Sequence, residues 1–158
     1  MMSTQIQQHV GDLLRSVRQG IIVHGCNAQG VMGGGFALQV KRAYPGAYEK
    51  YRKTYCSIGL RLGSIVPYEI ERPRGIAPLV IVNAITQNLF GTDRRYVEYP
   101  AVHSCFEETA KLARCLQITD VHFPLIGCGL AGGDWKEIEP IICKELDGLS
   151  AHLWTLPS

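Results

Sequence analysis

Short apolar runs and segments with helical spacing of apolar residues alternate along the chain. Ile21-Ile22-Val23 is a β-branched run that leads into a glycine-rich segment, as is typical of a buried strand. In the run 64–70, Pro67 has no N–H to donate, so an edge or bulged strand is expected. Further strands are predicted over residues 78–82, which lead into the polar segment 83–87, and over 121–126 and 152–156.

Between these runs the spacing predicts helices. Phe36, Val40 and Ala43 recur at helical spacing until Pro45 ends the pattern, and a second short helix is expected over 47–55. Asp134 and Glu137 have the spacing of an N-cap and its capping-box partner. The remaining helical positions are Val102, Phe106, Thr109, Ala113 and Leu116 in a long amphipathic helix, and Ile138, Ile142 and Leu146 after the cap.

The alternation of strands and helices predicts an α/β fold with helices on both faces of the sheet, and 158 residues suit a single domain over 1–158. Hydrophobic residues make up 46% of the chain and charged residues 19%, as in an ordinary globular protein. The net charge of +2 comes without any Lys/Arg block, so a dedicated nucleic-acid surface is not indicated.

The cysteines and the N-terminal segment indicate the cellular compartment of the protein. None of the six cysteines forms a Cys-x-x-Cys pair, which favours reduced, mostly buried thiols. Residues 1–10 lack the apolar core of a secretory signal, and no apolar run reaches the roughly 20 residues that span a bilayer. We therefore expect a cytoplasmic protein with no membrane partner.

Two glycine-rich loops carry the candidate binding chemistry. The segments 24–35 and 124–135 each follow a predicted strand and precede a predicted helix. Glycine backbones let N–H groups converge on phosphate oxygens, and a helix N-terminus favours an anion. Neither loop is a Walker A motif or a Rossmann fingerprint. A tight turn would explain either loop alone, but two such loops favour an anion cradle.

These segments resemble a known family. Gly11-Asp12-Leu13-Leu14, the strand and loop 21–35, and the segment 124–135 are similar to the macrodomain family of ADP-ribose binders, in the expected order over nearly the whole chain. The similarity is strongest to the branch that holds yeast-type ADP-ribose-1''-phosphate phosphatases, the human terminal-ADP-ribose glycohydrolase and the bacterial antitoxin that removes ADP-ribose from DNA. The resemblance implies a three-layer α/β/α fold with a mixed, mostly parallel sheet, and no cofactor.

The resemblance also implies roles for individual residues. Asp12 would accept a hydrogen bond from the adenine amino group beside the Leu13 backbone, Leu156 would pack on adenine, and Asn27 would meet the distal ribose. Asp12 has an alternative role as the N-cap of the segment that follows it. The residues expected around the diphosphate are Val31, Met32, Gly33, Gly34 and Gly35 in the first loop, and Ile126, Gly127, Cys128, Gly129 and Leu130 in the second.

Departures from this branch limit the possible chemistry. Its glycohydrolases carry a lysine where this chain has Thr86-Gln87-Asn88, and the human enzyme has an acid where this chain has Ala131, so a lysyl-adduct mechanism is not expected. His24, the first residue of the first loop, could act as base, acid or nucleophile, or could be a structural histidine. Asp93 could orient water beside Arg94 and Arg95 on a polar loop, or that loop could simply be solvated.

Cys128 is expected to be a neutral thiol, because a thiolate would repel the anionic ligand. His24, Cys26, His122 and Cys128 do not have a zinc-site spacing, so no metal is expected. The leading function is hydrolysis of ADP-ribose-1''-phosphate to ADP-ribose and phosphate. The alternatives are a lysine-independent ADP-ribosyl hydrolase acting on protein or nucleic acid, and a non-catalytic ADP-ribose reader.

Overall fold

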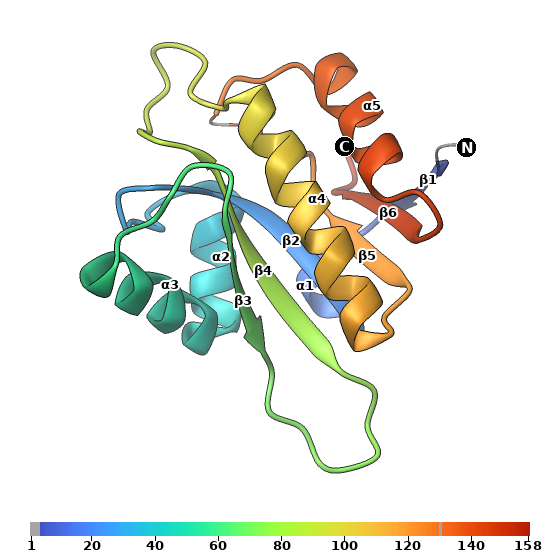
Figure 1. Ribbon diagram of the computed structural model, residues 1–158. Helices are drawn as coiled ribbons and strands as arrows, with labels where there is room; N and C mark the ends of the chain where they lie inside the picture. Colours follow the sequence, from blue (N-terminus) through green and yellow to red (C-terminus); the bar gives the residue numbers. More distant parts are fainter. Residues whose placement is uncertain (1–3, 130) are drawn as a thin grey trace.

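A six-stranded mixed sheet forms the centre of the molecule in the computed structural model, which describes residues 4–129 and 131–158 (Figure 1). The strand order is β1-β6-β5-β2-β4-β3. Neighbouring strands are parallel except for β3, which pairs antiparallel with β4 at the edge. The strands are β1 (Ile6–Val10), β2 (Gly20–Asn27), β3 (Ile65–Glu69), β4 (Leu79–Gln87), β5 (Asp120–Phe123) and β6 (Ser150–Thr155).

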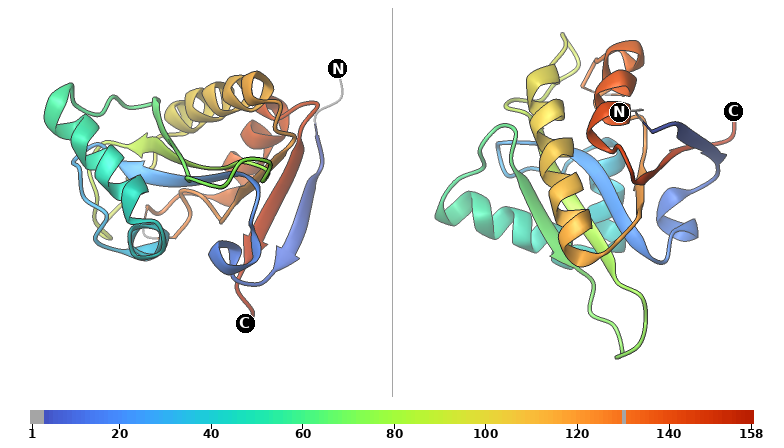
Figure 2. Two further views of the ribbon diagram at one scale, coloured as in Figure 1. Left: turned by 90° about the horizontal axis from the view of Figure 1, so that it is seen from below. Right: turned by 45° about the vertical axis from the view of Figure 1, so that its right-hand side comes forward.

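Helices cover both faces of this sheet (Figure 2). They are α1 (Leu13–Ser16), α2 (Gly35–Ala43), α3 (Pro45–Ser57), α4 (Tyr99–Leu116) and α5 (Trp135–Glu145). Ile21 packs with Phe106 of α4 and Ile138 of α5 in one core cluster, whereas Ile22 packs with Val40 of α2 in another. Because successive strand residues point to opposite faces, one buried strand supplies both cores. The predicted three-layer α/β/α fold is confirmed.

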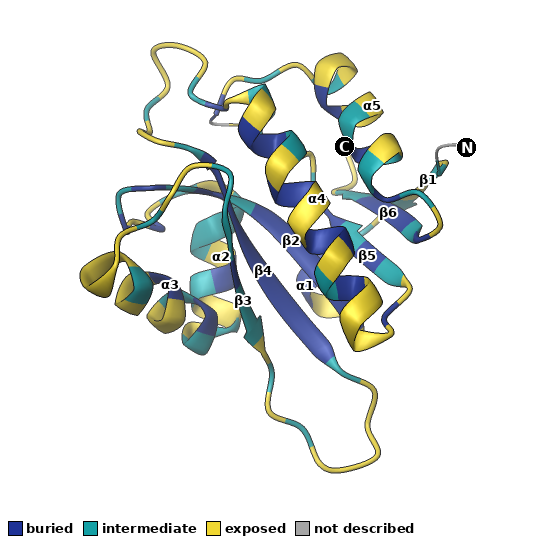
Figure 3. Ribbon diagram, viewed as in Figure 1, coloured by how far each residue is buried: buried dark blue, intermediate teal, exposed yellow. Residues whose placement is uncertain are grey.

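The central strands β2 and β4 are buried along most of their length (Figure 3). Both are longer than the apolar runs predicted. The polar segment 83–87 belongs to β4, and Asn83 and Thr86 are fully buried in it. By contrast, β5 ends at Phe123, one residue before Pro124, rather than at 126.

Several local details can be compared with the predictions. The edge strand β1 was not predicted from the sequence, and the one-turn helix α1 was anticipated only through the alternative N-cap role of Asp12. Asp134 does cap α5, with its carboxylate accepting from Lys136 N at 3.0 Å, but its own N–H donates to the Tyr99 hydroxyl at 3.1 Å rather than to Glu137. The predicted edge position of Pro67 is confirmed, since β3 ends the sheet.

All six cysteines are free thiols, but they are not mostly buried. Cys26 and Cys105 are buried, Cys128 and Cys143 are half-buried, and Cys56 and Cys115 are exposed. Across residues 4–129 and 131–158, none of the helices is both long enough and apolar enough to cross a membrane.

Candidate functional site

Three loops meet at one end of the sheet, where parallel strands β2, β4 and β5 have their carboxyl ends (Figure 1). Backbone hydrogen bonds join them. Ala28 N, after β2, donates to Asn88 O at 3.1 Å, and Tyr96 N, in the loop after β4, donates to Ala131 O at 2.8 Å. Open α/β sheets bind ligands at this end, where loops from adjacent strands converge.

These loops enclose a cavity of about 590 Å³, a volume suited to a nucleotide-sized ligand. Its described walls carry no charged side chain. The polar side chains are those of Asn27, Gln87 and Thr92, and most of the remainder is glycine backbone or apolar side chain. The other lining residues are Gly25, Cys26, Val31, Met32, Gly33, Gly34, Gly35, Phe36, Ala37, Phe90, Gly91, Pro124, Leu125, Ile126, Gly127, Gly129 and Ala131.

The N-terminus of α2 opens into this cavity. Gly34 is the N-cap and makes no side-chain capping hydrogen bond, and Gly34 to Ala37 all line the wall. The first N–H groups of a helix have no partner within the helix, and the dipole places partial positive charge there. This wall therefore offers unpaired backbone donors to an anion.

The second loop is held by internal hydrogen bonds. Ile126 N donates to Pro124 O at 2.7 Å and Cys128 N to Leu125 O at 3.2 Å, so these two amides are occupied within the loop. Gly127 and Gly129 line the cavity, and Gly127 has a φ of +73°. The prediction that Leu130 binds the diphosphate concerns a residue outside the described ones.

Asn27 lines the cavity at the end of β2 and orders the loop that follows. Its Nδ2 donates to Val31 O at 2.8 Å, and its Oδ1 accepts from Gln29 N at 2.9 Å. The hydroxyl of Tyr51 on α3 lies 2.6 Å from Asn27 O and 2.9 Å from Oδ1. Burial raises the pKa of Tyr51, so its hydroxyl stays a donor.

His24 lies within β2 rather than in the loop that follows it. It is fully buried, is absent from the cavity wall and lies 2.6 Å from Asn83 Oδ1 through Nε2. Burial lowers its pKa from 6.5 to about 4, with the Asn83 hydrogen bond opposing this shift. The strand continues past His24, which turns its side chain toward Phe36 beneath α2. This placement favours the structural histidine, and the catalytic role of His24 stays a prediction.

Asp93 lies just outside the cavity wall. Phe90, Gly91 and Thr92 line the cavity, whereas Asp93 is exposed and accepts a hydrogen bond from the Tyr96 hydroxyl. That hydrogen bond lowers the pKa of Asp93, so the group is a carboxylate at neutral pH. Asp93 and its partner Tyr96 thus lie beside the lining residues without belonging to them.

The residues expected at adenine lie at the neighbouring strand ends. Asp12 follows β1 and Leu156 follows β6, and these strands are paired in parallel. Asp12 caps α1, accepting from Leu14 N at 3.1 Å, which confirms the capping role without testing the adenine contact. Leu13 is buried and Leu156 is 65% exposed, and neither belongs to the cavity wall.

The thiols at the site are neutral. Burial raises the pKa of Cys26 and, together with the charge of Asp134, that of Cys128. The Cys128 thiol is directed to Ile126 O at 3.5 Å and packs against the core below the loop. The expectation of a neutral Cys128 agrees with these surroundings, although its side chain is not part of the cavity wall.

Sequence reasoning missed Gln87, Phe90 and Tyr51. Gln87 ends β4 and Phe90 is 54% exposed on the cavity wall, where an isolated aromatic in a polar loop was a usable signal. No sequence pattern pointed to Tyr51, because its contact with Asn27 is made from α3, a separate helix that follows the loop in sequence.

The model of the Macro domain family matches residues 23–142, a range that includes both glycine loops and all of β4. The chain belongs to the Macro domain family. This match agrees with the resemblance in the sequence and with the position of the cavity.

Relatives of this Macro domain include a DNA ADP-ribosyl glycohydrolase and an ADP-ribose 1''-phosphate phosphatase. The DNA ADP-ribosyl glycohydrolase of Thermus aquaticus is 31% identical over 150 residues, covering 91% of this chain but only 39% of that protein. The chain therefore spans about two fifths of the length of that relative. The ADP-ribose 1''-phosphate phosphatase of Scheffersomyces stipitis is 26% identical over 142 residues, covering 78% of this chain and 82% of the relative.

Solved structures agree with the fold of this Macro domain. The macrodomain of Mycobacterium tuberculosis DarG superposes with a TM-score of 0.81 at 26% identity, covering 98% of this chain and 99% of that chain. Thermosipho africanus DarTG, solved in complex with ADP-ribose, has a TM-score of 0.73 at 22% identity, covering 93% of this chain and 40% of that one.

Proposed function

We propose that this Macro domain binds ADP-ribose in the cavity and hydrolyses ADP-ribose-1''-phosphate to ADP-ribose and inorganic phosphate. The single observation that carries the binding proposal is the uncapped N-terminus of α2, which opens into an uncharged cavity of nucleotide size. Backbone N–H groups there would bind the diphosphate. Across the cavity, Gly127 and Gly129 allow the second loop to approach the same group closely.

The rest of the ligand would extend along the ends of the parallel strands. Adenine would lie toward Asp12, Leu13 and Leu156, beyond β1 and β6. The distal ribose would lie toward Asn27, with Gln87 and Phe90 on the wall beside it. Since β2 and β4 are paired through Asn27 and Gln87, these two amides approach the same part of the ligand.

The uncharged lining of the cavity favours a substrate whose leaving group can depart without help from a protein acid. No charged acid or base lies among the described residues of the cavity wall, and His24 is fully buried within β2. A phosphate on the distal ribose leaves with its negative charge dispersed over its oxygens and needs less help from a protein acid than an amine or a base. The C1''–O bond would break, water oriented by the Asn27 or Gln87 amide would add its oxygen to C1'', and the leaving phosphate would take up the proton that the water loses. The relative named ADP-ribose 1''-phosphate phosphatase supports this choice.

Asp93 is proposed to keep Phe90 and Thr92 in place on the cavity wall beside the distal ribose. Its carboxylate and the Tyr96 hydroxyl crowd Gly91, where an added Cβ would lie 2.9 Å from each. Loss of the carboxylate in Asp93→Ala should loosen Phe90 and Thr92, raising KM more than it lowers kcat. Asp93→Asn keeps an acceptor for Tyr96 and should stay close to the wild type.

A second candidate, hydrolysis of ADP-ribose from DNA, is supported by the relatives named DNA ADP-ribosyl glycohydrolase. The absence of a lysine at residues 86–88 weighs against it. The deciding experiment incubates the purified chain with ADP-ribose-1''-phosphate and with ADP-ribosylated DNA, and measures phosphate and ADP-ribose. Phosphate release supports the leading proposal, and ADP-ribose release from DNA supports the second. Tight ADP-ribose binding with neither product would indicate a non-catalytic ADP-ribose reader.

Binding is tested separately by calorimetry with ADP-ribose and AMP, where equal affinities would refute the diphosphate assignment. Gly129 is the best position for a blocking variant, since nothing lies within 4 Å of an added Cβ and its φ is not in the left-handed region. Gly129→Glu should abolish binding by placing a carboxylate beside the phosphates. Gly129→Gln, of nearly equal size, should weaken it much less. Equal ADP-ribose affinities of the two variants would show that the phosphates do not lie beside Gly129.

A further inference from the structure

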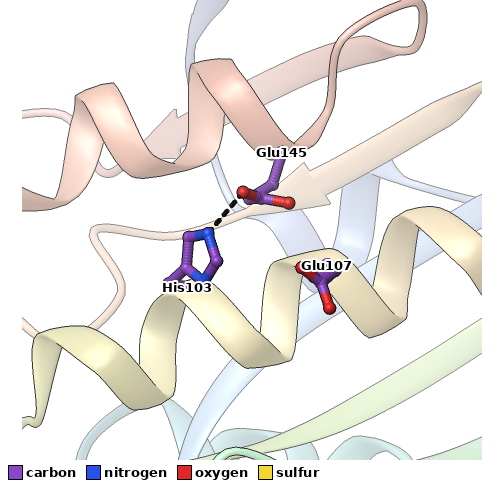
Figure 4. Close-up of side chains that lie close together, drawn as sticks. All are labelled: His103, Glu107 and Glu145. Carbon is purple, nitrogen blue, oxygen red and sulfur yellow. Dashed lines mark ion pairs between the residues drawn. The ribbon is translucent and has the colours of Figure 1, made fainter.

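A cluster of three potential metal ligands lies between α4 and α5, away from the cavity wall (Figure 4). His103 and Glu107 are one helical turn apart on α4, and Glu145 is the last residue of α5. Residues at positions i and i+4 share a helix face, so the sequence of α4 places both side chains toward the end of α5. The ligand atoms of the three residues all lie within 4.8 Å of one another.

This spacing suits a single divalent ion. Zinc binds histidine nitrogen and carboxylate oxygen at about 2.0–2.2 Å, so two ligands of one ion are roughly 3–4 Å apart. His103 Nε2 and Glu145 Oε1 are 2.6 Å apart as an ion pair. They would need to separate by only about 1 Å, a small rotation for two partly exposed side chains, to admit the ion.

The charges around the cluster favour a cation. Glu145 is nearly buried, with 12% of its side chain exposed, and its recorded partner is His103, which is charged only when protonated. Glu107 has only a loose partner: Lys111, 63% exposed, lies 3.8 Å from Glu107 and 3.3 Å from Glu108. A divalent ion would neutralise both carboxylates of the cluster, while a neutral His103 would supply a nitrogen ligand.

We propose that His103, Glu107 and Glu145 bind a first-row transition-metal ion such as Zn²⁺, with water completing its coordination. One nitrogen and two carboxylate ligands favour zinc over Mg²⁺ or Ca²⁺, which prefer oxygen alone. The exposed faces of His103 and Glu107 give the ion a path from solvent. The ion would join α4 to α5, and these helices begin directly after the cavity loops that follow β4 and β5. Glu145 is far in sequence from His103 and Glu107, so the three form no compact motif. The expectation of no metal came from His24, Cys26, His122 and Cys128, a set that includes none of these ligands.

The test is a Zn²⁺ titration of the EDTA-treated full chain against a chromophoric chelator, together with the absorption spectrum of Co²⁺ as a probe. It uses a Cys56→Ser/Cys115→Ser background, which removes the two exposed thiols as competing ligands. One site is expected, with a Co²⁺ spectrum that lacks thiolate charge-transfer bands. His103→Ala should abolish it, and Glu107→Gln should weaken it by more than about tenfold.

Glu107→Gln is the informative variant because it leaves the His103–Glu145 ion pair in place. Glu108→Gln is its matched control, since it makes the same change one residue along α4 and touches only Lys111. Zinc affinity that is unchanged in Glu107→Gln, or that falls equally in both variants, would overturn the proposal. So would the absence of zinc binding to the background protein. Either result would mean that the cluster serves only through the His103–Glu145 ion pair between α4 and α5.

Discussion

The Tyr51 hydroxyl lies within 3 Å of two oxygens of Asn27, the backbone carbonyl at 2.6 Å and the side-chain Oδ1 at 2.9 Å. Tyr51 is fully buried on α3, whereas Asn27 lines the cavity. A core residue therefore fixes the amide that is proposed to meet the distal ribose. Positioning of this kind matters because a binding group held by packing loses little freedom when the ligand arrives.

Tyr51→Phe should weaken ADP-ribose binding severalfold while keeping the fold. The change removes the hydroxyl and leaves the ring, so the free energy of unfolding should fall by about 1 kcal/mol. Calorimetry and urea denaturation measure the two effects. Tyr48→Phe, also on α3, is the control and should alter neither by a comparable amount. A variant that is less stable but binds normally would show that Asn27 needs no such orientation.

The fold requires glycine at position 127, so Gly127→Ala should destabilise the protein. Its φ of +73° disfavours any side chain, and an added Cβ would lie 2.7 Å from Val97 Cγ2 and 3.1 Å from Ile138 Cδ1. We expect a loss of about 1–3 kcal/mol in the free energy of unfolding. Gly129→Ala, which meets open space, should lose far less. Equal stabilities would mean that the loop relaxes freely around Val97.

The sequence was sufficient to predict most of the architecture, because α2 to α5 and the four central strands carry strong periodic or apolar signals. It did not predict β1, since Ile6 and His9 are only half-buried on an edge strand and the apolar pattern is weak. The loops could be located because two glycine clusters follow separate strands, a pair that favours an anion cradle over two tight turns. Their amides could not be assigned, as Ile126 and Cys128 use theirs inside the loop.

The misplacement of His24 has one physical cause. The apolar run ends at Val23, so the strand was expected to end there and His24 to enter the loop. Pairing with β4 instead continues through His24 opposite Asn83 as far as Asn27. A polar pair on neighbouring buried strands satisfies each partner, so the strands continue through it without apolar residues. Single-sequence periodicity cannot detect a pair separated by 59 positions.

The buried His24 makes stability depend on pH. Its pKa is about 4 in the folded state against 6.5 for a solvated histidine, so the unfolded chain binds the proton more tightly. Its contribution to stability is complete above about pH 6.5 and is lost as the pH falls toward 4. The contribution is at most about 3–4 kcal/mol, from 1.4 kcal/mol per pKa unit.

His24→Gln should reduce this pH dependence, although His122, whose pKa burial also lowers to about 4, still contributes. The check compares the free energy of unfolding at pH 7.5 and pH 4.5 in both proteins. Phosphate release per folded molecule should be similar in the variant and the wild type at neutral pH. A drop of 10²–10⁴-fold, as is typical on losing a general acid or base, would instead restore His24 as a catalyst.

Asp12 allows a capping role and a binding role to be separated by one pair of variants. Asp12→Ala removes the cap of α1 and should cost about 0.5–2 kcal/mol of stability. Asp12→Ser keeps a good N-cap but shortens the side chain, so its oxygen no longer reaches a base lying beyond the strand end. If Asp12 accepts the adenine amino group, both variants should weaken ADP-ribose by about 1–3 kcal/mol, the cost of losing a charged hydrogen bond.

The ligand supplies the matching control for Asp12. The hypoxanthine analogue of ADP-ribose lacks the amino group, so the wild type should bind it more weakly than ADP-ribose. Asp12→Ser should bind the two ligands almost equally, because the group that distinguishes them is gone. Calorimetry of both ligands with both proteins completes a cycle that isolates this one contact. If Asp12→Ser keeps the wild-type preference, the carboxylate serves α1 alone, and adenine is recognised by the backbone at Leu13.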